Sequence, residues 1–574
     1  MSLKVVIVGA VALGPKAACR LKRLVPDAEV TLIDRDTLVS YGGCGIPYFI
    51  SGNVSDAKEL MSTSFHMVRD PHFFQQAKGV RVLTRTEAVA IDRPAKTLRI
   101  RNLDDGQEQD LPYDKLVLAT GTRPNRLPIP GADLERVFTI ADLGGAIQLK
   151  DLIAAGQVGQ AVVIGGGAIG LEMVESLTDL WGVETTLIEV RDQLLPGIVS
   201  PTLARMVQTH LKEKEVAGIH LSETAIRLEG EGAVERVVTD RRTIETDLVI
   251  IAVGVRPNVE LAAEAGLDLS ETGAIAVNDQ FVTSDPDIYA GGDCTDQLNL
   301  ITGRRMHLAS GSLANRQGRI IGTNLAGGNE TFDGIVGSFI LKAFEMSVAA
   351  VGLSLPMARS AGFDALSAFV VQGDRAHFYP GMDMMFMELV VERNTRRVLG
   401  LQGVSGNGDA LAARIDAVAA ILKYKPTVRD ISNLEMAYAP PYAAAMDILN
   451  ALGNTAENIL AGRNRVVEPD EFLKMFAGDG ECVCLDVRGP ANAHPFVEQF
   501  PGRWVNIPQD ELQDRLVEVP RDKELILICN SGVRSFEAQV ALDHCGLKAN
   551  RNLQGGVGAL KKLGWPLETE NQDE

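Results

Sequence analysis

A short apolar run, a glycine turn, a helical pattern, a second apolar run and an acidic residue follow one another near the start of the chain. Residues 5–8 form the first run, Gly9 and Gly14 frame the turn, and Asp34 ends the second run. This is the order of a dinucleotide-binding βαβ unit, in which a helix joins two parallel strands. Val11 stands where the middle glycine of the usual fingerprint is expected. The first copy therefore predicts a nucleotide site with an altered fingerprint.

The same order returns later in the chain with a complete glycine fingerprint. Gly165, Gly167 and Gly170 match the three glycines that make the turn, let a pyrophosphate approach the backbone and let the helix pack on the strand. Glu189 ends the next apolar run, where a carboxylate can bind ribose hydroxyls and repels a 2′-phosphate. The second site is therefore predicted to prefer NADH. Arg191 weakens this preference without reversing it, so NADPH stays an alternative.

Length and charge limit what else the chain can be. Its 574 residues correspond to about four domains of roughly 150 residues. The formal net charge of −19 argues against nucleic acid as a partner, so an anionic ligand must be met by local donors. No apolar run reaches the roughly 20 residues of a membrane helix, and no signal-peptide pattern opens the chain. We expect a cytoplasmic protein with no membrane partner.

Three further motifs surround the second βαβ unit. Residues 116–121 and 248–254 are apolar runs that end in glycine, each followed within three residues by Arg-Pro-Asn, and residues 283–293 end in Gly-Gly-Asp. These paired signals predict one module inserted in another. Taken in order, the motifs resemble those of the FAD/NAD-linked disulfide reductase family over roughly residues 1–450. The resemblance implies FAD, NADH as electron donor, and an Asp293 carboxylate on the ribityl chain. The predicted cofactor-binding residues are Gly9, Gly14, Asp34, Thr120, Gly121, Gly165, Gly167, Gly170, Glu189, Gly254 and Asp293.

Cys44 lies in a glycine-rich loop that ends at Pro47, and no second cysteine follows within the next ten residues. A paired dithiol of the glutathione reductase type is therefore excluded. A single thiolate can attack an S–S bond, hold a mixed disulfide or persulfide, and be regenerated by electrons from a reduced flavin. A buried, inert cysteine is the structural alternative.

The segment from Ser40 to Tyr48 resembles the single-cysteine branch of the family, which contains coenzyme A disulfide reductases, persulfide reductases, NADH oxidases and NADH peroxidases. Peroxidases carry a histidine in the first glycine loop, and Ala12 at the matching position argues against that activity. Gly43 replaces an asparagine that is usual in coenzyme A disulfide reductases. The predicted substrate-binding residues are Ser40, Tyr442 and, for the phosphates of coenzyme A, Arg20 and Arg23.

Two aromatic segments, 377–381 and 438–442, resemble parts of the family's dimerisation domain. In relatives, tyrosines from these segments reach across the dimer interface to the active-site cysteine of the partner. Tyr379 and Tyr438 are the best matches, and Tyr442 is a third candidate. The resemblance implies a homodimer with shared active sites, whereas aromatic packing at an interface is the plainer alternative.

The chain after residue 466 resembles a rhodanese domain in the order and spacing of its motifs. Cys529 follows a predicted strand, and Arg534 opens the next predicted helix. Successive backbone N–H groups in such a loop can form an anion nest that stabilises a thiolate or a persulfide. Four residues separate the two side chains, as in sulfurtransferases, whereas related phosphatases use a longer loop. A purely structural role, as in rhodanese-like domains that lack the cysteine, is the alternative.

The other five cysteines are expected to be structural. Cys482 and Cys484 share one face of a strand, but no second pair stands at ligand spacing, so we predict no metal site. Cys19, Cys294 and Cys545 are interpreted as packing residues.

We therefore predict an α/β protein with two nested Rossmann-like dinucleotide-binding domains, an α/β dimerisation domain and a C-terminal rhodanese domain. The predicted segments are 1–148 and 255–330 for FAD binding, 149–254 for NADH binding, 331–452 for dimerisation and 465–574 for the rhodanese-like domain. A strand is expected at 385–391, a helix at 411–422 and a polar linker at 451–467.

The predicted activity is the FAD-dependent reduction of a persulfide, polysulfide, coenzyme A disulfide or coenzyme A persulfide by NADH. Cys44 attacks the S–S bond, and Cys529 carries or delivers sulfane sulfur; coenzyme A is then a carrier or bound ligand. One alternative is an NADH oxidase that reduces O₂ through a Cys44 sulfenic acid. Another is a sulfur-carrier or sensor protein in which the flavin state controls partner binding.

Overall fold

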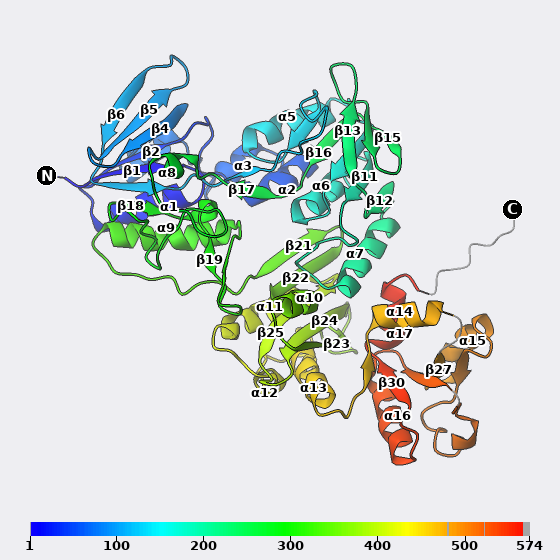
Figure 1. Ribbon diagram of the computed structural model, residues 1–574. Helices are drawn as coiled ribbons and strands as arrows, with labels where there is room; N and C mark the ends of the chain where they lie inside the picture. Colours follow the sequence, from blue (N-terminus) through cyan, green and yellow to red (C-terminus); the bar gives the residue numbers. More distant parts are fainter. Residues whose placement is uncertain (1, 479–481, 522, 566–574) are drawn as a thin grey trace. The chain divides into compact units, whose positions relative to one another are not determined.

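The computed structural model describes residues 2–478, 482–521 and 523–565 (Figure 1). Residues 1, 479–481, 522 and 566–574, which fall in the predicted segments 1–148 and 465–574, lie outside the described part. The chain divides into two compact units, Met1–Val190 with Val216–Ile335, and Arg191–Glu215 with Val336–Glu574. The five predicted segment boundaries stay predictions.

A five-stranded parallel sheet in the order β18-β7-β1-β2-β3 forms the first module of the first unit. Its strands are β1 (Lys4–Val8), β2 (Glu29–Ile33), β3 (Val80–Leu83), β7 (Lys115–Leu118) and β18 (Ile288–Ala290). Alternate residues of β1 face opposite sides of the sheet. Val5 and Ile7 pack with helices α1 (Leu13–Leu24) and α9 (Gly311–Leu325), whereas Val6 and Val8 pack toward a three-stranded antiparallel sheet. That sheet consists of β4 (Thr86–Asp92), β5 (Thr97–Asn102) and β6 (Glu108–Pro112).

A second five-stranded parallel sheet, in the order β12-β11-β10-β16-β9, forms the second module of the first unit. Its strands are β9 (Val137–Thr139), β10 (Gln160–Ile164), β11 (Glu184–Glu189), β12 (Gly218–Leu221) and β16 (Leu248–Ile251). Helix α6 (Ala168–Thr178) begins directly after Gly167 and contains Gly170, the last glycine of the fingerprint. The prediction of two nested βαβ modules is confirmed, because β18 returns to the first sheet beside β7 after the second sheet is complete.

The two Arg-Pro-Asn segments pair where the chain passes between the modules. β8 (Thr122–Pro124) and β17 (Val255–Pro257) form an antiparallel ribbon in which Arg123 lies opposite Arg256. The repeated tripeptide therefore marks the exit from the first module and the return to it.

An antiparallel sheet in the order β21-β22-β25-β24-β23 forms the centre of the second unit. Its strands are β21 (Phe339–Ala343), β22 (Met346–Gly352), β23 (Ala365–Gly373), β24 (Met384–Glu392) and β25 (Val398–Ser405). Helix α11 (Gly408–Leu422) packs on β22 and β25, and α13 (Ile448–Leu460) packs on β23 and β24. The strand predicted at 385–391 and the helix predicted at 411–422 are confirmed as parts of β24 and α11.

The polar linker predicted at 451–467 is largely wrong, because α13 extends to Leu460. The Asp447 and Asn450 side chains form a capping box at its start. Leu449, Leu452 and Ala456 recur at helical spacing and are buried, so the polar residues of the segment are the outer face of an amphipathic helix.

A parallel sheet in the order β26-β30-β29-β27-β28 completes the second unit. Its strands are β26 (Val466–Val467), β27 (Cys482–Asp486), β28 (Trp504–Asn506), β29 (Glu524–Ile528) and β30 (Asn550–Leu553). Its helices are α14 (Pro469–Ala477), α15 (Pro490–Gln499), α16 (Val533–His544) and α17 (Gly556–Lys562).

Buried and partly buried hydrogen bonds join this C-terminal part to the antiparallel sheet and to helix α7. The Phe369 amide on β23 donates to Gln554 Oε1 at 2.7 Å, and Ser367 Oγ donates to Glu468 Oε1 at 3.2 Å. Thr202 Oγ1, in α7 (Pro201–Glu213), donates to Asp470 Oδ2 at 3.0 Å. Two polar contacts from β23 and one from α7 thus hold the C-terminal sheet in place.

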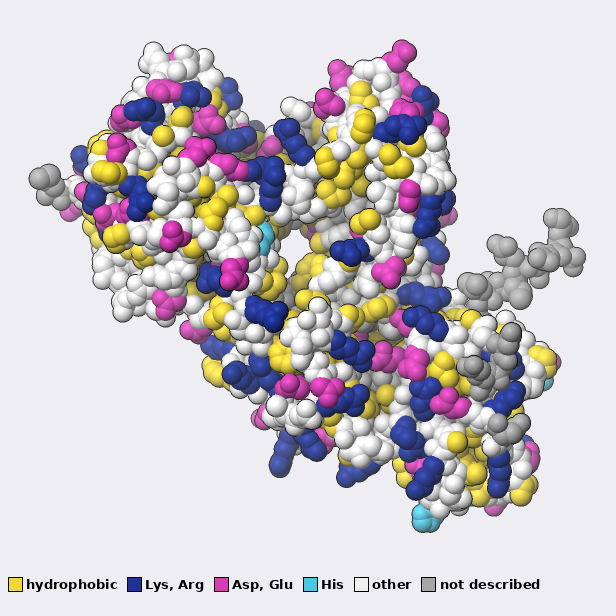
Figure 2. Space-filling model, viewed as in Figure 1, with side chains coloured by type: hydrophobic (Ala, Val, Ile, Leu, Met, Phe, Trp, Pro, Cys, Tyr) yellow, Lys and Arg dark blue, Asp and Glu magenta, His cyan; other side chains and the backbone are white. Residues whose placement is uncertain are grey.

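The surface carries both signs of charge. On the face shown in Figure 2, lysine and arginine side chains are interspersed with aspartate and glutamate on both units. Among the described residues, no helix has the length and apolar character needed to cross a membrane.

Glu388, on β24, places a carboxyl group at the contact between the two sheets of the second unit. Its side chain is only 4% exposed, and Oε2 has no hydrogen-bond partner. Burial raises the pKa of Glu388 to about 7, and the nearby carboxylates of Glu468 and Asp470 add to that effect. Folding therefore favours the protonated carboxyl at this position.

We predict that stability falls as the pH rises through this pKa. A raised pKa in the folded state gives a contribution that is complete below the pKa of unfolded glutamate, about 4.3, and is lost as the pH rises through about 7. Glu388→Gln should therefore gain stability relative to the wild type between pH 5 and pH 8, by up to about 3 kcal/mol. Thermal unfolding curves at pH 5, 6, 7 and 8 measure the difference. Glu271→Gln, at an exposed carboxylate, is the control, and parallel pH profiles for wild type and Glu388→Gln would contradict the prediction.

Candidate active site

The two glycine turns have the same backbone geometry. Gly9 and Gly165 adopt φ of 108° and 117°, and a Cβ on either would lie within 2.4 Å of a carbonyl oxygen. A Cβ on Gly14 would lie 2.0 Å from the Gly9 oxygen, and one on Gly170 would lie 1.9 Å from the Gly165 oxygen. Gly167, by contrast, has no atom within 4 Å of its Cβ position. Both turns are thus closed on the protein side, and the second is open at Gly167, where a pyrophosphate can approach.

An acidic side chain lies over each turn. Asp34 Oδ2 accepts from the Ala10 amide at 2.7 Å, and Glu189 Oε2 accepts from the Gly166 amide at 2.6 Å. Burial raises the pKa of Asp34, partly offset by its backbone hydrogen bonds. Asp34 directly follows β2 and Glu189 is the last residue of β11, so both carboxyl groups stand at the end of the second strand of their βαβ unit, where this fold binds a ribose. The donor set therefore fits two dinucleotides.

The crossover between the modules holds three more predicted cofactor residues. Thr120 Oγ1 donates to the Asn258 carbonyl at 2.7 Å, and Asn258 Nδ2 donates to the Thr120 carbonyl at 2.8 Å. Gly121 and Gly254 adopt left-handed φ of 64° and 87°. The Gly254 carbonyl accepts from the Asn125 amide, so both loops are held at the sheet edge.

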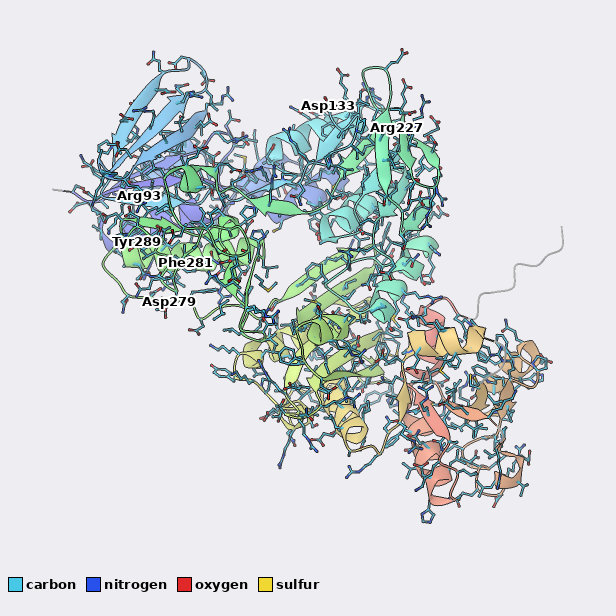
Figure 3. The ribbon with its side chains drawn as sticks, viewed as in Figure 1. Arg93, Asp133, Arg227, Asp279, Phe281 and Tyr289 are labelled. Atoms are coloured by element: carbon cyan, nitrogen blue, oxygen red, sulfur yellow. The ribbon has the colours of Figure 1, made fainter. Side chains whose placement is uncertain are left out.

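The segment 283–293 is fixed at both ends. Arg93 Nε donates to Asp285 Oδ2 at 2.7 Å, and the buried Phe281 and Tyr289 anchor the same region in the core (Figure 3). At its far end, Asp293 Oδ1 accepts from the Ser310 amide at 3.0 Å. Burial raises the pKa of Asp293. The carboxyl group is therefore held at the start of α9.

Cys44 lies at the same helix end. Its thiol is exposed, in the single turn Gly43–Gly45 that precedes α2 (Ile46–Ser51). A Cβ on Gly311, the first residue of α9, would lie 3.6 Å from Cys44 Sγ. The N-terminal end of a helix favours an anion, because its first amides have no intrahelical partner. The exposure of the thiol does not fit the alternative of a buried cysteine.

The predicted substrate residues are only partly gathered around Cys44. Ser40 is buried with a φ of 53°, and its amide donates to the Ala10 carbonyl beside the first glycine turn. Arg20 Nε donates to Thr323 Oγ1 on α9, and Arg23 is exposed in the last turn of α1. The structure thus ties Arg20 to α9 rather than to the Cys44 loop.

Glu172 is a titratable residue that sequence reasoning missed. It lies on α6, and burial, followed by the neighbouring Glu175, raises its pKa to about 7. A narrow hollow between α2 and α6 is lined by Tyr48, Glu172 and Glu175, and burial and these carboxylates raise the pKa of Tyr48. The signal available in the sequence was an acid two residues after the last glycine of the fingerprint.

The three predicted tyrosines come from two neighbouring loops of the second unit. Tyr379 lies on the loop after β23, and Tyr438 and Tyr442 lie on the irregular segment between α12 (Val428–Ser432) and α13. The Ala376 amide donates to the Pro440 carbonyl at 3.2 Å and so joins the loops. All three rings are exposed. The structure therefore brings these tyrosines to one surface.

The loop between β29 and α16 surrounds the second predicted sulfur centre. Cys529 Sγ is buried; the Gly532 amide donates to it at 3.1 Å, and Ser535 Oγ lies 3.2 Å away. Ser535 Oγ also lies 2.7 Å from Asn552 Oδ1. Arg534 is exposed in the first turn of α16. Ser535 and Asn552 are contacts that the sequence motif alone did not indicate.

Helix α17 binds the carbonyl groups of the Cys529 loop. The Val557 amide donates to the Cys529 carbonyl and the Gly558 amide to the Asn530 carbonyl, both at 2.9 Å. Gly556 has a φ of 56°, and a Cβ on it would lie 2.3 Å from the Cys529 oxygen. Because the carbonyls of the loop point at α17, its amides are left to face an anion.

The remaining cysteines differ in exposure. Cys294, Cys482 and Cys484 are buried, and burial raises the pKa of each thiol, as expected for packing residues. Cys19 is half-buried. The packing role predicted for Cys545 is wrong, because the residue lies at the C-terminal cap of α16 and is exposed.

Known families match the three parts of the chain in the same order. Residues 3–318 match the pyridine nucleotide-disulphide oxidoreductase family, residues 340–449 its dimerisation domain, and residues 468–563 a rhodanese-like domain. The chain belongs to the pyridine nucleotide-disulphide oxidoreductase family. Members of the family use FAD and NAD(P)H, so the predicted family and cofactors are confirmed.

Two relatives and one solved structure match most of the chain. The chain is 34% identical over 453 residues to an NAD(P)H coenzyme A polysulfide/persulfide reductase of Pyrococcus horikoshii, covering 79% of this chain and 98% of the relative. It is 32% identical over 461 residues to an NADH oxidase of Methanocaldococcus jannaschii, covering 79% and 100%. The structure of an NAD-dependent persulfide reductase from A. fulgidus superimposes with a TM-score of 0.92 at 37% identity, over 97% of this chain and 100% of the other.

The two glycine turns make separable predictions for the two cofactors. Because an added Cβ clashes with the turn itself, Gly14→Ala should yield protein with reduced FAD content. Gly170→Ala should keep its FAD but bind NADH at least about tenfold more weakly, the effect of roughly 1–3 kcal/mol of overpacking. Flavin absorbance and NADH titration measure the two effects. Gly489→Ala is the control, because Gly489 has a φ of −60° and no atom within 4 Å of its Cβ position; loss of FAD from Gly170→Ala alone would contradict the assignment.

Proposed function

We propose that this protein is an FAD-dependent reductase of persulfides, polysulfides or coenzyme A disulfides that uses NADH. The observation that carries the proposal is the placement of Cys44 Sγ and the Asp293 carboxyl at the N-terminal end of one helix, α9. Asp293 belongs to the motif that holds the flavin in the resembled family, so a thiol and a flavin would meet at this point. Two sulfur reductases, one matching 79% of this chain and the other 97%, support the same activity.

Cys44 is the nucleophile in the proposed reaction. Its thiolate attacks the outer sulfur of a persulfide R–S–SH, which forms Cys44–S–SH and releases the thiolate RS⁻. Two electrons then cleave the new S–S bond and give the Cys44 thiolate and HS⁻. Bound FAD supplies the transfer of these two electrons from NADH. The sum is R–S–SH + NADH + H⁺ → R–SH + H₂S + NAD⁺.

The chain's own residues hold the parts of this reaction in place. The amides at the start of α9 stabilise the thiolate between turnovers. Glu189 selects NADH, because a carboxylate beside the ribose repels a 2′-phosphate. In a homodimer, the exposed Tyr379 and Tyr438 lie close to Cys44 of the partner subunit and donate a hydrogen bond to the leaving thiolate. Tyr442 and the arginines Arg20 and Arg23 are proposed to contact the substrate or its carrier.

Cys529 is proposed to carry sulfane sulfur for this reaction. The buried Sγ with its donors from Gly532 and Ser535 suits a persulfide anion, and Arg534 on the rim of the loop suits an incoming anionic donor. Loading and delivery are thiol exchange steps, so the sulfur is transferred without a change in the total number of electrons.

Cys44→Ser should abolish sulfur-dependent NADH consumption while the bound flavin is still reduced by NADH. The hydroxyl cannot attack sulfur at neutral pH, so we expect a loss of at least about a thousandfold in kcat. Anaerobic assays with a small persulfide measure turnover, and stopped-flow absorbance measures flavin reduction. Cys545→Ser, at an exposed thiol in the C-terminal part of the chain, is the matched control. Full turnover in Cys44→Ser would overturn the proposed nucleophile, and wild-type NADH consumption as fast with O₂ alone would favour an oxidase.

Cys529→Ser should lower turnover on polysulfide more than on a small persulfide. A small persulfide can reach Cys44 directly, whereas the proposed delivery route passes through Cys529. We expect about a tenfold difference between the two substrates, which corresponds to 1.4 kcal/mol. Gly556→Ala, which displaces the Cys529 carbonyl, should act in the same direction, and Gly546→Ala, in open surroundings, is its control. Equal effects on both substrates would contradict a delivery role.

A further inference from the structure

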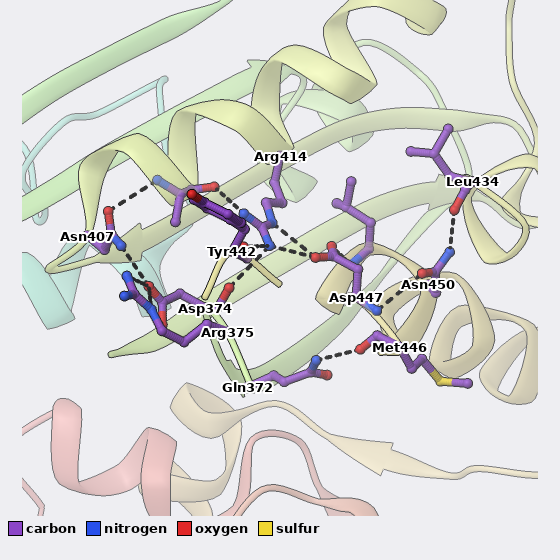
Figure 4. Close-up of polar contacts among 12 residues, drawn as sticks. Gln372, Asp374, Arg375, Asn407, Arg414, Leu434, Tyr442, Met446, Asp447 and Asn450 are labelled. Carbon is purple, nitrogen blue, oxygen red and sulfur yellow. Dashed lines mark hydrogen bonds and ion pairs between the residues drawn. The ribbon is translucent and has the colours of Figure 1, made fainter. Parts of the chain in front are cut away.

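Arg414 is a buried guanidinium that lies between the two loops carrying the exposed tyrosines. It stands on α11 with 4% of its surface exposed, and its ion-pair partner Asp447 is 2% exposed. Nη2 and Nε donate to Asp447 Oδ2 at 2.7 and 3.1 Å (Figure 4). Nη2 also lies 3.3 Å from the Tyr442 carbonyl and 3.2 Å from the Asp374 carbonyl. One side chain therefore contacts both loops through their backbones.

The loop 433–447 is held by its carbonyl groups. Asn450 Nδ2 donates to the Leu434 carbonyl at 2.9 Å, and Gln372 Nε2 donates to the Met446 carbonyl at 2.8 Å. Arg414 binds the Tyr442 carbonyl between these two anchors. The loop has no regular secondary structure, so these contacts set its course. Its aromatic side chains stay outside, with Tyr442 74% exposed and Tyr438 51% exposed.

The loop 374–383 is closed at its base by Asp374. The Asp374 amide donates to the Asp383 carbonyl at 2.8 Å, and the Asp383 amide returns a bond to Asp374 Oδ1 at 3.0 Å. Arg375 and Asn407 Nδ2 bind the same carboxylate. Arg414 Nη2 donates to the Asp374 carbonyl. Tyr379 extends from this loop, and its side chain is 39% exposed.

Stability alone does not account for this arrangement. An ion pair this deeply buried costs desolvation that its attraction only about repays, and well-packed apolar residues are often as stable. The planar fork of an arginine, however, can bind a carboxylate and two carbonyls in fixed directions, which the single ammonium of a lysine cannot. Nη2 faces the carbonyl of each loop as well as Asp447, and Nε also binds Asp447, which indicates a role in fixing the loops relative to each other.

We infer that Arg414, together with Asp447, is a positioning residue that sets the geometry of Tyr379 and Tyr438 for the reaction at Cys44. The inference rests on the proposed function, in which these tyrosines serve Cys44 of the partner subunit. Arg414 touches no reacting atom in this scheme and acts through the backbones of the two loops.

Arg414→Lys in the full-length holoenzyme tests the inference. A lysine at this position keeps the positive charge, so the ion pair to Asp447 can persist. It lacks the planar guanidinium group that binds both loop carbonyls, so the loops are expected to shift. Reduction of the flavin by NADH should be unchanged, because it does not involve the tyrosines. Re-oxidation by a small persulfide should slow by about tenfold to a hundredfold, the range expected for displacement of a positioned group. Asp447→Asn, which leaves the cap of α13 with a polar side chain, should give the same pattern and provides a second variant.

A matched control and a double-mutant cycle separate positioning from general stability. Arg488→Lys alters an equally buried pair, Arg488–Asp486, in the C-terminal part of the chain, and should leave re-oxidation by the small persulfide unchanged. In a Tyr379→Phe/Tyr438→Phe background, Arg414→Lys should cause no further slowing, because its effect passes through those rings.

Each other outcome overturns a distinct statement. If Arg414→Lys slows flavin re-oxidation equally with and without the tyrosine hydroxyls, the inference is overturned. It is also overturned if light scattering shows that Arg414→Lys no longer forms a dimer. If re-oxidation is slow in Tyr379→Phe/Tyr438→Phe but normal in Arg414→Lys, the role of Arg414 is overturned and the role of the tyrosines is not. Normal re-oxidation in the tyrosine variant itself overturns the proposed function of the tyrosines and, with it, the role of Arg414.

Discussion

The start of α9 lies against two functional groups from distant parts of the chain. The Ser310 amide binds Asp293, and Gly311 lies against Cys44 Sγ. This convergence requires α9 to approach α1 closely. A Cβ on Gly318 or Gly322 would lie 2.7 Å from a carbonyl oxygen of α1, so only glycine permits the contact. Two helix-packing glycines thus set the place of the thiol relative to the nucleotide turns.

Sequence reasoning was sufficient where a residue type is demanded by local backbone geometry. The glycines of both turns, the acids after the second strands and the loop around Cys529 are such positions, and the structure explains each by a clash, a left-handed φ or an amide contact. The nested order of the modules followed from the repeated Arg-Pro-Asn segments, which pair directly as β8 and β17.

Sequence reasoning failed where a residue's role is set by partners far away in the chain. The polar residues after residue 451 predict a linker only when their helical period is ignored, because those up to Leu460 lie on the outer face of α13. Glu388 and Arg414 carry no local motif at all. Their roles arise only when β24 meets Glu468, and when α11 meets the two tyrosine loops. Exposed Cys545 shows the reverse error, because a helical pattern does not say which turn is the last.

The return of β18 to the first sheet has a consequence for the order in which the protein can be made. Leu116 on β7 pairs with Ile288 on β18, and the whole second module lies between them in the chain. At about 5–20 residues per second, the ribosome needs on the order of ten seconds or more to supply the missing strand. Until then β7 is an open edge of an apolar parallel sheet, and the last strand of the inserted module, β16, is made before β18. The nucleotide site formed last is therefore the one nearer the N-terminus, and synthesis order and folding order are reversed for the two modules.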